Sequence, residues 1–168
     1  MTKIFISGMP GCGKTSLLLQ IIDELKKRGR KVGGILSPEI RNKIRKGFWI
    51  VDIASGKKAK MAEKSQAKGC KVAGYVINKE AIDEIVKQMR KSVDGCDVIV
   101  IDEIGKMELC SETFKQAISE LIKSQKPLIA SLHRAYFNEY KSKYDGIFLW
   151  LTRENFEKIK EHILKFIT

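Results

Sequence analysis

The sequence predicts an α/β domain in which helices flank a mostly parallel sheet that carries an antiparallel extension. Apolar runs of strand length alternate with amphipathic segments of helical length along most of the chain. The run at residues 97–103 is almost wholly apolar until it ends in two acids, as is typical of a central parallel strand buried on both faces. Strand-like segments between residues 47 and 77 follow one another without an intervening helix, which favours antiparallel pairing there.

The first part of the chain predicts a strand, a helix and a second strand. Residues 3–7 form a short apolar run, and apolar residues recur at helical spacing over residues 17–25. Basic residues and Gly29 follow, as is typical of the last turn and the end of a helix. Residues 32–36 are again strand-like, and the polar residues 37–46 predict a loop that leaves this strand.

The antiparallel extension is predicted from the next third of the chain. Residues 47–53 form a strand, residues 54–57 form a turn, and residues 58–62 are the returning arm of a hairpin. Residues 71–77 predict one further strand, after which helical periodicity returns over residues 80–93.

The last third predicts alternating strands and helices around the buried run at 97–103. A helix over residues 111–124 begins with a loose capping-box pattern at Ser111. No repeat, linker or low-complexity segment divides the chain, so residues 1–168 are expected to form a single domain. The remaining predicted elements are strands at 127–132 and 146–151, a short helix at 135–143, and a final helix that begins at Thr152 or Asn155 and ends near residue 166.

The stretch at residues 8–15 fits the pattern G-x-x-x-x-G-K-[ST] at every fixed position, between a predicted strand and a predicted helix. Glycine lets the backbone adopt positive φ and approach an anion closely, and N–H groups at the start of a helix hold phosphates. Lys14 is expected to reach the β and γ oxygens, and the Thr15 hydroxyl to ligate Mg²⁺. The structural alternative is a glycine-rich turn that only joins a strand to a helix. The predicted nucleotide-binding residues are Gly8, Met9, Pro10, Gly11, Cys12, Gly13, Lys14, Thr15 and Ser16.

Two acids, Asp102 and Glu103, end the most hydrophobic predicted strand. Open α/β sheets bind ligands at the carboxyl ends of their strands. In a protein with a phosphate loop the first acid holds Mg²⁺, directly or through water, so Asp102 is predicted to be a metal residue with Thr15. Glu103 is then placed to orient and polarise a water for attack on the γ-phosphorus. The alternative is that both are solvated acids at a strand end.

The chain is basic, with 32 Lys and Arg against 20 Asp and Glu and a net charge of +12. Such a balance attracts polyanions, either nucleic acid or nucleotide phosphates. A lysine-rich solvated surface, as in heat-adapted proteins, is the preferred interpretation, because the lysines are spread along the chain without an aromatic-and-basic recognition motif. Nucleic acid is therefore a possible partner that is not favoured. No feature fixes the oligomeric state, for which a monomer is the preferred expectation.

The cysteines predict neither a zinc site nor a disulfide framework. Cys12, Cys70, Cys96 and Cys110 lie far apart and form no C-x-x-C pair, so reduced thiols in a cytoplasmic protein are expected. The chain enters a strand at once without a signal-peptide pattern, and no apolar run approaches the roughly 20 residues of a membrane span. The expected location is the cytoplasm, with no membrane partner.

Blocks along nearly the whole chain resemble, in family order, the small nucleoside triphosphatases first described from thermophiles, which have relatives in animals. The most specific block is Asp-Glu-Ile-Gly-Lys-Met-Glu-Leu at residues 102–109, because the phosphate loop alone is shared with many kinases and GTPases. The other blocks are residues 8–15, 32–35 with 39–41, 47–48, 72–76 and 152–155.

This resemblance implies a RecA-like arrangement, with another strand between the strand at 3–7 and the strand at 97–103. It also implies Mg²⁺-dependent hydrolysis of NTP (ATP, GTP, CTP or UTP) to NDP and phosphate, with broad base tolerance. Glu103 would be the catalytic base. Ser131, at the end of the next strand, would be the polar group that senses the γ-phosphate, whereas His133 and Arg134 follow in a region where the family pattern varies.

Phosphoryl transfer also needs a cation that neutralises the transition state. Arg41 is ranked first because it belongs to a family block and leaves a strand end, and Lys106 is ranked second. Arg45 and Arg134 are the other candidates. Each of these residues is alternatively a solvated surface charge.

Two other functions remain as alternatives to an NTP hydrolase. A small-molecule or nucleotide kinase shares the phosphate loop, but it normally carries an arginine-rich lid, and only Arg134 and Arg153 follow Arg90 here. A nucleic-acid-associated ATPase would use the basic surface. Residues 78–80 match only half of the guanine-reading Asn-Lys-x-Asp pattern, so guanine specificity is not expected. Trp49 and Tyr75 are interpreted as sheet or core residues in preference to base-stacking ones.

Overall fold

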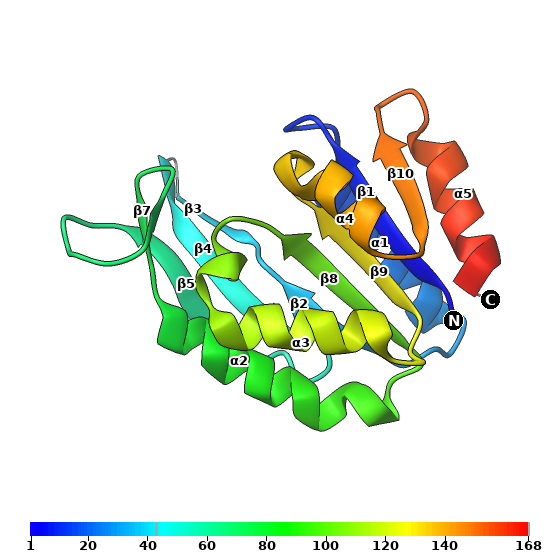
Figure 1. The fold of residues 1–168 in the computed structure, drawn as a ribbon, viewed down its shortest axis with the longest axis horizontal. Helices are drawn as coiled ribbons and strands as arrows, with labels where there is room; N and C mark the ends of the chain where they lie inside the picture. The colour runs from blue at the N-terminus through cyan, green and yellow to red at the C-terminus, as the bar shows by residue number, and fades with distance from the viewer. Residues whose placement is uncertain (43, 168) are drawn as a thin grey trace.

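The computed structural model describes residues 1–42 and 44–167, including the side chains of all but residues 42, 44 and 45. Within these residues, ten strands form one mixed sheet that is covered by helices on both faces (Figure 1). The predicted α/β class, with its mostly parallel main sheet and its antiparallel extension, is confirmed.

The parallel part of the sheet consists of the strands predicted near residues 3–7 and 32–36 and of those predicted between residues 97 and 151. All neighbouring pairs in it are parallel, and β9 lies between β1 and β8, as the resemblance implied. Their carboxyl ends therefore lie at one edge of the sheet. In order across the sheet, the strands are β10 (Ile147–Leu151), β1 (Lys3–Gly8), β9 (Leu128–Leu132), β8 (Val98–Ile104) and β2 (Val32–Leu36).

The antiparallel part continues from β2 through β4 (Ile44–Asp52) and β5 (Lys58–Lys64), as the hairpin prediction required. The prediction of one strand at residues 71–77 is wrong: β6 (Lys71–Val72) and β7 (Tyr75–Ile77) form a tight hairpin. Ala73 and Gly74 form its turn with φ of 49° and 83°. Two-residue hairpin turns usually contain two residues that tolerate positive φ, such as Asn-Gly. Alanine rarely adopts positive φ, so only Gly74 marks this turn in the sequence.

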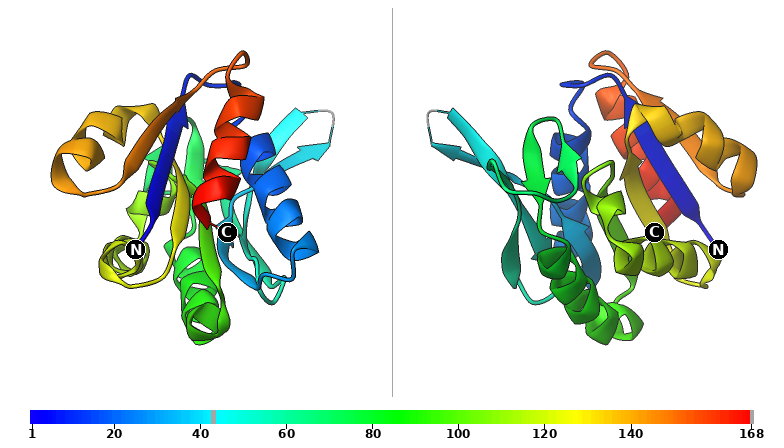
Figure 2. Two further views of the ribbon diagram at one scale, coloured as in Figure 1. Left: turned by 90° about the vertical axis from the view of Figure 1, so that its right-hand side faces the viewer. Right: turned by 60° about the vertical axis from the view of Figure 1, so that its left-hand side comes forward.

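The predicted loop at residues 37–46 is also wrong in part. The chain forms β3 (Glu39–Asn42), which pairs with the start of β4, and this hairpin projects from the body of the protein (Figure 2). Most of its residues are polar, so no alternation of apolar and polar side chains marks the strands in the sequence. The pairing register also shifts at Ile40 and Arg41.

Helices cover the two faces of the sheet with separate cores. Alternate residues of β1 show this division, because Phe5 packs into the core under α2, α3 and α4, whereas Ile4 and Ile6 pack under α1 and α5. The helices are α1 (Lys14–Lys27), α2 (Lys79–Ser92), α3 (Glu112–Lys123), α4 (Phe137–Lys143) and α5 (Phe156–Ile167), and the short 3₁₀ turns are η1 (Val93–Gly95), η2 (Glu108–Cys110) and η3 (Arg134–Tyr136).

Capping side chains fix the starts of α2 and α3. The Asn78 side chain accepts a hydrogen bond from the Ala81 N–H at 3.1 Å, and Ser111 accepts one from the Phe114 N–H at the same distance. Such a cap is worth about 1 kcal/mol. Asn78, part of the incomplete guanine pattern, therefore serves to start a helix.

The prediction that all cysteines are reduced is wrong for one pair. Cys70 and Cys110 form a disulfide, whereas Cys12 and Cys96 are thiols. The two bonded residues are 40 positions apart, and the contact exists because β6 and the loop after β8 meet in space. Nothing in their spacing predicts this meeting.

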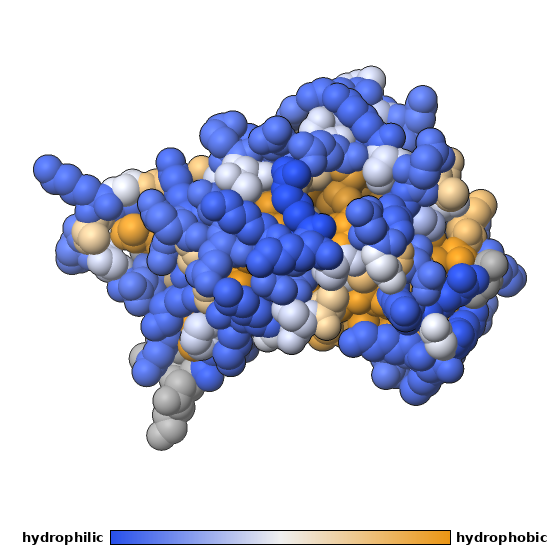
Figure 3. Space-filling model, turned by 90° about the horizontal axis from the view of Figure 1, so that it is seen from below, coloured by the Kyte–Doolittle hydropathy of each residue, from blue (hydrophilic) through white to orange (hydrophobic). Residues whose placement is uncertain are grey.

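One face of the protein is mainly polar. The face seen in Figure 3 is covered mainly by hydrophilic side chains, with smaller apolar areas between them. Among the described residues, no helix is both long enough and apolar enough to cross a membrane.

Candidate functional site

The loop between β1 and α1 is wound tightly by its own backbone. The Cys12 N–H donates to the Met9 carbonyl at 3.1 Å, and Gly11 and Gly13 adopt left-handed φ values of 77° and 102°. Gly13 is also the residue that caps α1, and it has no side chain with which to bond the first-turn N–H groups. No capping side chain therefore occupies these groups, and unbonded N–H groups at a helix start are the kind that can bind an anion.

Close packing at Gly8 holds this loop against the end of β10. A Cβ atom at Gly8 would lie 2.6 Å from the Cys12 sulfur and 2.6 Å from the Leu151 carbonyl oxygen, so no larger residue fits. The Lys14 ammonium donates to the Gly8 carbonyl at 3.3 Å. The lysine side chain therefore lies over the loop instead of extending into solvent.

The predicted metal residues meet beside the loop. Asp102 is buried near the end of β8, and its carboxylate accepts hydrogen bonds from the hydroxyls of Thr15 on α1 and Ser131 on β9, the latter at 2.6 Å. Burial raises the pKa of Asp102, while these hydroxyls and the Lys14 charge oppose the rise. The Ser131 hydroxyl, expected to sense a phosphate, is fully buried and bonded to the acid.

Glu103 lies at an irregularity in β8. Pairing with β9 passes from Ile101 opposite Ala130 to Ile104 opposite Leu132, so β8 carries one extra residue there. The Asp102–Glu103 peptide bond is cis. Burial, followed by repulsion from Asp102, raises the pKa of Glu103 against the opposing effect of Lys14. A raised pKa brings a carboxylate closer to the range that suits a general base.

Glu108 is a further acid of this site, and sequence reasoning gave it no role. It is only 3 % exposed, and burial, together with the nearby charge of Glu103, raises its pKa to about 8. A Cβ atom at Gly105 would lie 2.7 Å from Oε1 of Glu103 and 2.8 Å from Oε2 of Glu108, so both carboxyl groups pack against this glycine. The signal available in the sequence was its place in the block at 102–109.

The cations around the phosphate loop come mainly from the loops after β8 and β9. A guanidinium nitrogen of Arg134 lies 3.5 Å from the Met9 sulfur, at the tip of the phosphate loop. The pKa of His133 is lowered by burial and then by the positive charges of Lys106, Lys14 and Arg134. These cations therefore surround the same region.

Arg41, ranked first from the sequence, lies elsewhere. It is on the projecting β3–β4 hairpin, its side chain is 71 % exposed, and it pairs with Glu39 at 2.6 Å. The side chain of Arg45 is outside the described residues. Tyr75 is buried in the core, and Lys58 lies 4.6 Å from the ring centroid of the half-buried Trp49, in line with the structural interpretation of both aromatic residues.

Comparison with known proteins assigns this chain to a family. A family model described as NTPase matches residues 3–164. The chain belongs to this family. It is 42 % identical to the nucleoside-triphosphatase THEP1 of Methanocaldococcus jannaschii, over 96 % of this chain and 95 % of that protein. It is 38 % identical to the THEP1 of Pyrococcus abyssi, over 96 % and 90 %.

Solved structures support the same assignment for this NTPase-family chain. The crystal structure of THEP1 from Aquifex aeolicus superposes with a TM-score of 0.81 at 28 % identity, covering 99 % of both chains. The solution structure of a human cancer-related nucleoside triphosphatase gives 0.81 at 26 % identity, covering 100 % of this chain and 98 % of that one. The predicted family, the predicted fold class and the expectation of an NTP-hydrolysing enzyme are thereby confirmed.

Proposed function

We propose that this NTPase-family protein hydrolyses nucleoside triphosphates to nucleoside diphosphate and phosphate, with Mg²⁺ as cofactor and broad tolerance of the base. One observation carries the proposal. The hydroxyl of Thr15 meets the carboxylate of Asp102 at the start of α1, directly beside the phosphate loop, and Glu103 is the next residue. This combination supports phosphate binding, a metal position and a base within one small volume.

The residues present fit a magnesium ion. Mg²⁺ is usually held by one or two protein oxygens, with phosphate oxygens and waters completing six ligands. Thr15 and Asp102 supply a hydroxyl and a carboxylate of this kind. When bound there, the ion neutralises charge on the β and γ oxygens. Among the described residues no cluster of three or more His, Cys, Asp or Glu side chains is arranged to hold a metal, so nucleotide and water are needed to complete the coordination.

Ser131 acts in this proposal by positioning Asp102. Its hydrogen bond to Oδ1 fixes the carboxylate and stabilises its ionised form in a buried site. The role expected from the resemblance, direct sensing of the γ-phosphate, would require this hydroxyl to turn away from Asp102.

Glu103 is the proposed base. A water oxygen attacks the γ-phosphorus, its proton passes to the Glu103 carboxylate, and the bond to the β–γ bridging oxygen breaks, so that the diphosphate leaves. Burial raises the proton affinity of Glu103, and Glu108 packs against the same glycine. At neutral pH the raised pKa keeps Glu108 protonated, so it adds no negative charge beside the γ-phosphate.

Arg134 is the proposed transition-state cation, with Lys106 as its neighbour. Its guanidinium already contacts the phosphate loop, whereas Arg41 is paired with Glu39 on the projecting hairpin. An arginine that stabilises the transferred phosphoryl group typically contributes ~10³–10⁵ in rate.

Broad base tolerance agrees with the use of Asn78 as a helix cap, since the residue is engaged with Ala81 and is not available to read a base. Cytoplasmic location, the preference for a monomer and the view of nucleic acid as a possible but not favoured partner stay predictions.

Phosphate release from each of the four NTPs, with Mg²⁺ or with EDTA, tests the proposal. Comparable rates with all four and dependence on Mg²⁺ are expected. Added RNA, DNA and AMP address the alternatives: strong stimulation by nucleic acid would favour an associated ATPase, and a labelled γ-phosphate found on AMP would favour a kinase. Failure to release phosphate from any NTP would contradict the proposal.

The Asp102→Asn variant tests the metal position. It removes the charge that attracts the cation while keeping a similar shape, so the Mg²⁺ concentration needed for half-maximal hydrolysis should rise at least tenfold. Titration of Mg²⁺ at saturating NTP measures this. An unchanged requirement would place the metal elsewhere.

A further inference from the structure

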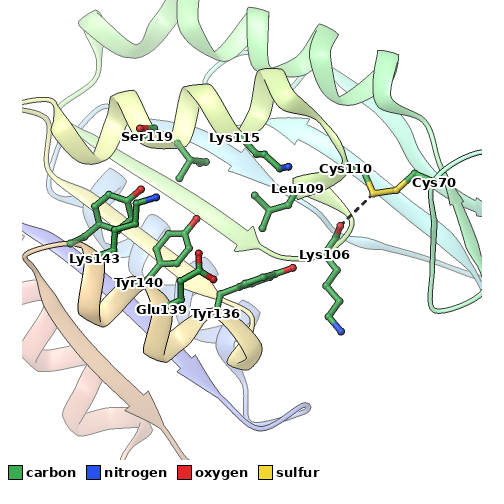
Figure 4. Close-up of a pocket in the computed structure, with 12 residues that line it drawn as sticks. Cys70, Lys106, Leu109, Cys110, Lys115, Ser119, Tyr136, Glu139, Tyr140 and Lys143 are labelled. Atoms are coloured by element: carbon green, nitrogen blue, oxygen red, sulfur yellow. Dashed lines mark hydrogen bonds between the residues drawn. A yellow bond between two sulfur atoms is a disulfide. The ribbon is translucent and has the colours of Figure 1, made fainter.

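A cavity of about 600 Å³ opens between α3 and α4, and of the residues given a part in hydrolysis Lys106 lines it (Figure 4). Its size lies in the range of about 300–1,000 Å³ that is usual for small-molecule sites. Tyr136 and Tyr140 line it on the side of η3 and α4, Lys115 lines it from α3, and the Cys70–Cys110 disulfide lies at one end.

The aromatic lining offers flat surfaces with polar tips. Burial raises the pKa of Tyr136 and raises that of Tyr140 to about 12, so both phenols keep their protons at neutral pH and remain hydrogen-bond donors. The rings of Tyr140 and Tyr144 lie 5.3 Å apart. A flat heterocycle can stack on such rings, whatever the base.

The charged lining favours an anion. The lysines that line the cavity are Lys106, Lys115 and Lys143, and Glu139 is the acid among its described lining residues. Lys115 also pairs with Glu112 at 3.0 Å, and the Lys143 ammonium lies 5.2 Å from the centroid of the Tyr144 ring. These contacts are exposed and therefore weak, so they leave the excess of positive charge available to a ligand.

One end of the cavity adjoins the hydrolytic site. Lys106 lines the cavity and, together with Lys14, lowers the pKa of His133. Tyr136 also lines the cavity, and the carboxyl group of Glu108 contributes to the raised pKa of this tyrosine. Lys106 also follows Gly105, against which the carboxyl groups of Glu103 and Glu108 pack, so a ligand in the cavity would lie near these acids and outside the phosphate loop.

We propose that this cavity binds a second small ligand, an anion that carries a flat ring, of the nucleoside monophosphate class. Its phosphate lies among the lysines, and its ring lies on the tyrosines. The inference goes beyond NTP hydrolysis, and binding of this ligand does not depend on the proposed chemistry.

Calorimetric titration with AMP tests the proposal while a non-hydrolysable triphosphate analogue and Mg²⁺ saturate the phosphate loop. Adenosine and inorganic phosphate are the matched probes, because each keeps only one half of the ligand. AMP should bind at least tenfold more tightly than either probe. Binding of the analogue is measured first and reports on the phosphate loop alone. If the analogue does not bind, the proposed function is contradicted, whereas the proposal for the cavity is still judged by the binding of AMP.

Charge reversals locate the bound AMP. The double variant Lys115→Glu/Lys143→Glu should weaken AMP binding at least tenfold without changing analogue binding. Lys123→Glu/Lys141→Glu is the matched control, because it makes the same charge change on the exposed surfaces of the same two helices outside the cavity lining. Undetectable AMP binding, binding of adenosine or phosphate as tight as that of AMP, or an equal loss in both double variants would overturn the proposal.

Discussion

The parallel and antiparallel halves of the sheet differ in the residues that lie at the ends of their strands. At the carboxyl ends of the parallel strands, the phosphate loop, Asp102, Ser131 and Arg134 come together although they are far apart in the sequence. The antiparallel strands carry exposed charges instead, such as the Arg41–Glu39 pair. Parallel strands all end at one edge, so their loops converge, whereas successive antiparallel strands end at opposite edges.

The two halves are joined where β2 pairs with β4. Ile35 lies opposite Asp52 and Leu36 opposite Val51, and Asp52 is buried with its carboxylate bonded to Ser55. The disulfide adds a covalent link from Cys70 before β6 to Cys110 in the loop after β8. The antiparallel half is thus expected to contribute to the stability of the folded protein and to contribute little to the chemistry at the site.

The largest expected difference separates the two arginines. Arg134→Ala should lower the single-turnover rate of NTP hydrolysis by ~10³ or more, because the guanidinium at the phosphate loop is removed from the developing charge. Arg41→Ala, in the antiparallel half, should change the rate less than about threefold, since it breaks only an exposed ion pair.

Stopped-flow or quench measurement of phosphate release gives both rates, and nucleotide affinity is measured in parallel. A large loss in Arg41→Ala with a parental rate in Arg134→Ala would reverse the assignment and require the hairpin to fold over the bound nucleotide.

Glutamine substitutions compare how an acid of the parallel half and an acid of the antiparallel half affect the rate of hydrolysis. Glu103→Gln keeps size and hydrogen bonding but removes the basic oxygen, so hydrolysis should fall by ~10²–10⁴ while Mg·NTP affinity stays near the parental value. The control is Glu63→Gln on β5, which removes an exposed acid paired with Lys60 and should leave the rate unchanged. Near-parental hydrolysis by Glu103→Gln would mean that another group takes the proton from the attacking water.

The sequence also predicts the parallel half of the sheet better than the antiparallel half. The motif at 8–15 and the acids at 102–103 could be placed because a parallel strand buried on both faces is an almost continuous apolar run, and its end marks the site. Strand β3 and the start of β4 were missed because these polar residues show no alternation of apolar and polar side chains. The contact of Arg134 with Met9 could not be predicted because it depends on the packing of the loop after β9.

Glu108 and the disulfide could not be predicted for a different reason. An acid in a predicted loop is normally exposed, and only the three-dimensional path of residues 104–110 buries this one. The pairing of Cys70 with Cys110 likewise depends on the sheet topology. Local patterns specify elements, whereas contacts between loops require the assembled fold.

The disulfide provides a smaller test of the link between the halves. Cys70→Ser should lower the free energy of unfolding by about 2–4 kcal/mol, mainly because the unfolded chain is no longer cross-linked. The rate of hydrolysis should change less than about threefold. Urea unfolding with and without reductant measures the effect, and reductant should abolish the difference between parent and variant. A large rate loss at unchanged stability would instead give the antiparallel half a direct part in the chemistry.

The last comparison concerns Glu108 and the dependence of stability on pH. Its pKa is raised from 4.5 to about 8 by burial and by the carboxylates of Glu103 and Asp102, with a backbone hydrogen bond in partial opposition. Between these two values the folded protein holds a proton that the unfolded chain has lost. The free energy of unfolding therefore falls as pH rises through this window, by about 1.4 kcal/mol per pH unit, and this contribution is constant below and above it.

Glu108→Gln removes this proton linkage while keeping a neutral side chain of the same size. Its neighbours Glu103 and Asp102 should titrate as in the parent, since Glu108 is uncharged below about pH 8. Relative to the parent, the variant should gain stability steadily from about pH 5 to about pH 8. Urea unfolding at several pH values measures the difference, with the exposed Glu63→Gln as a control that should show almost no trend. Parallel stability curves for parent and Glu108→Gln would show that Glu108 ionises normally in the folded protein.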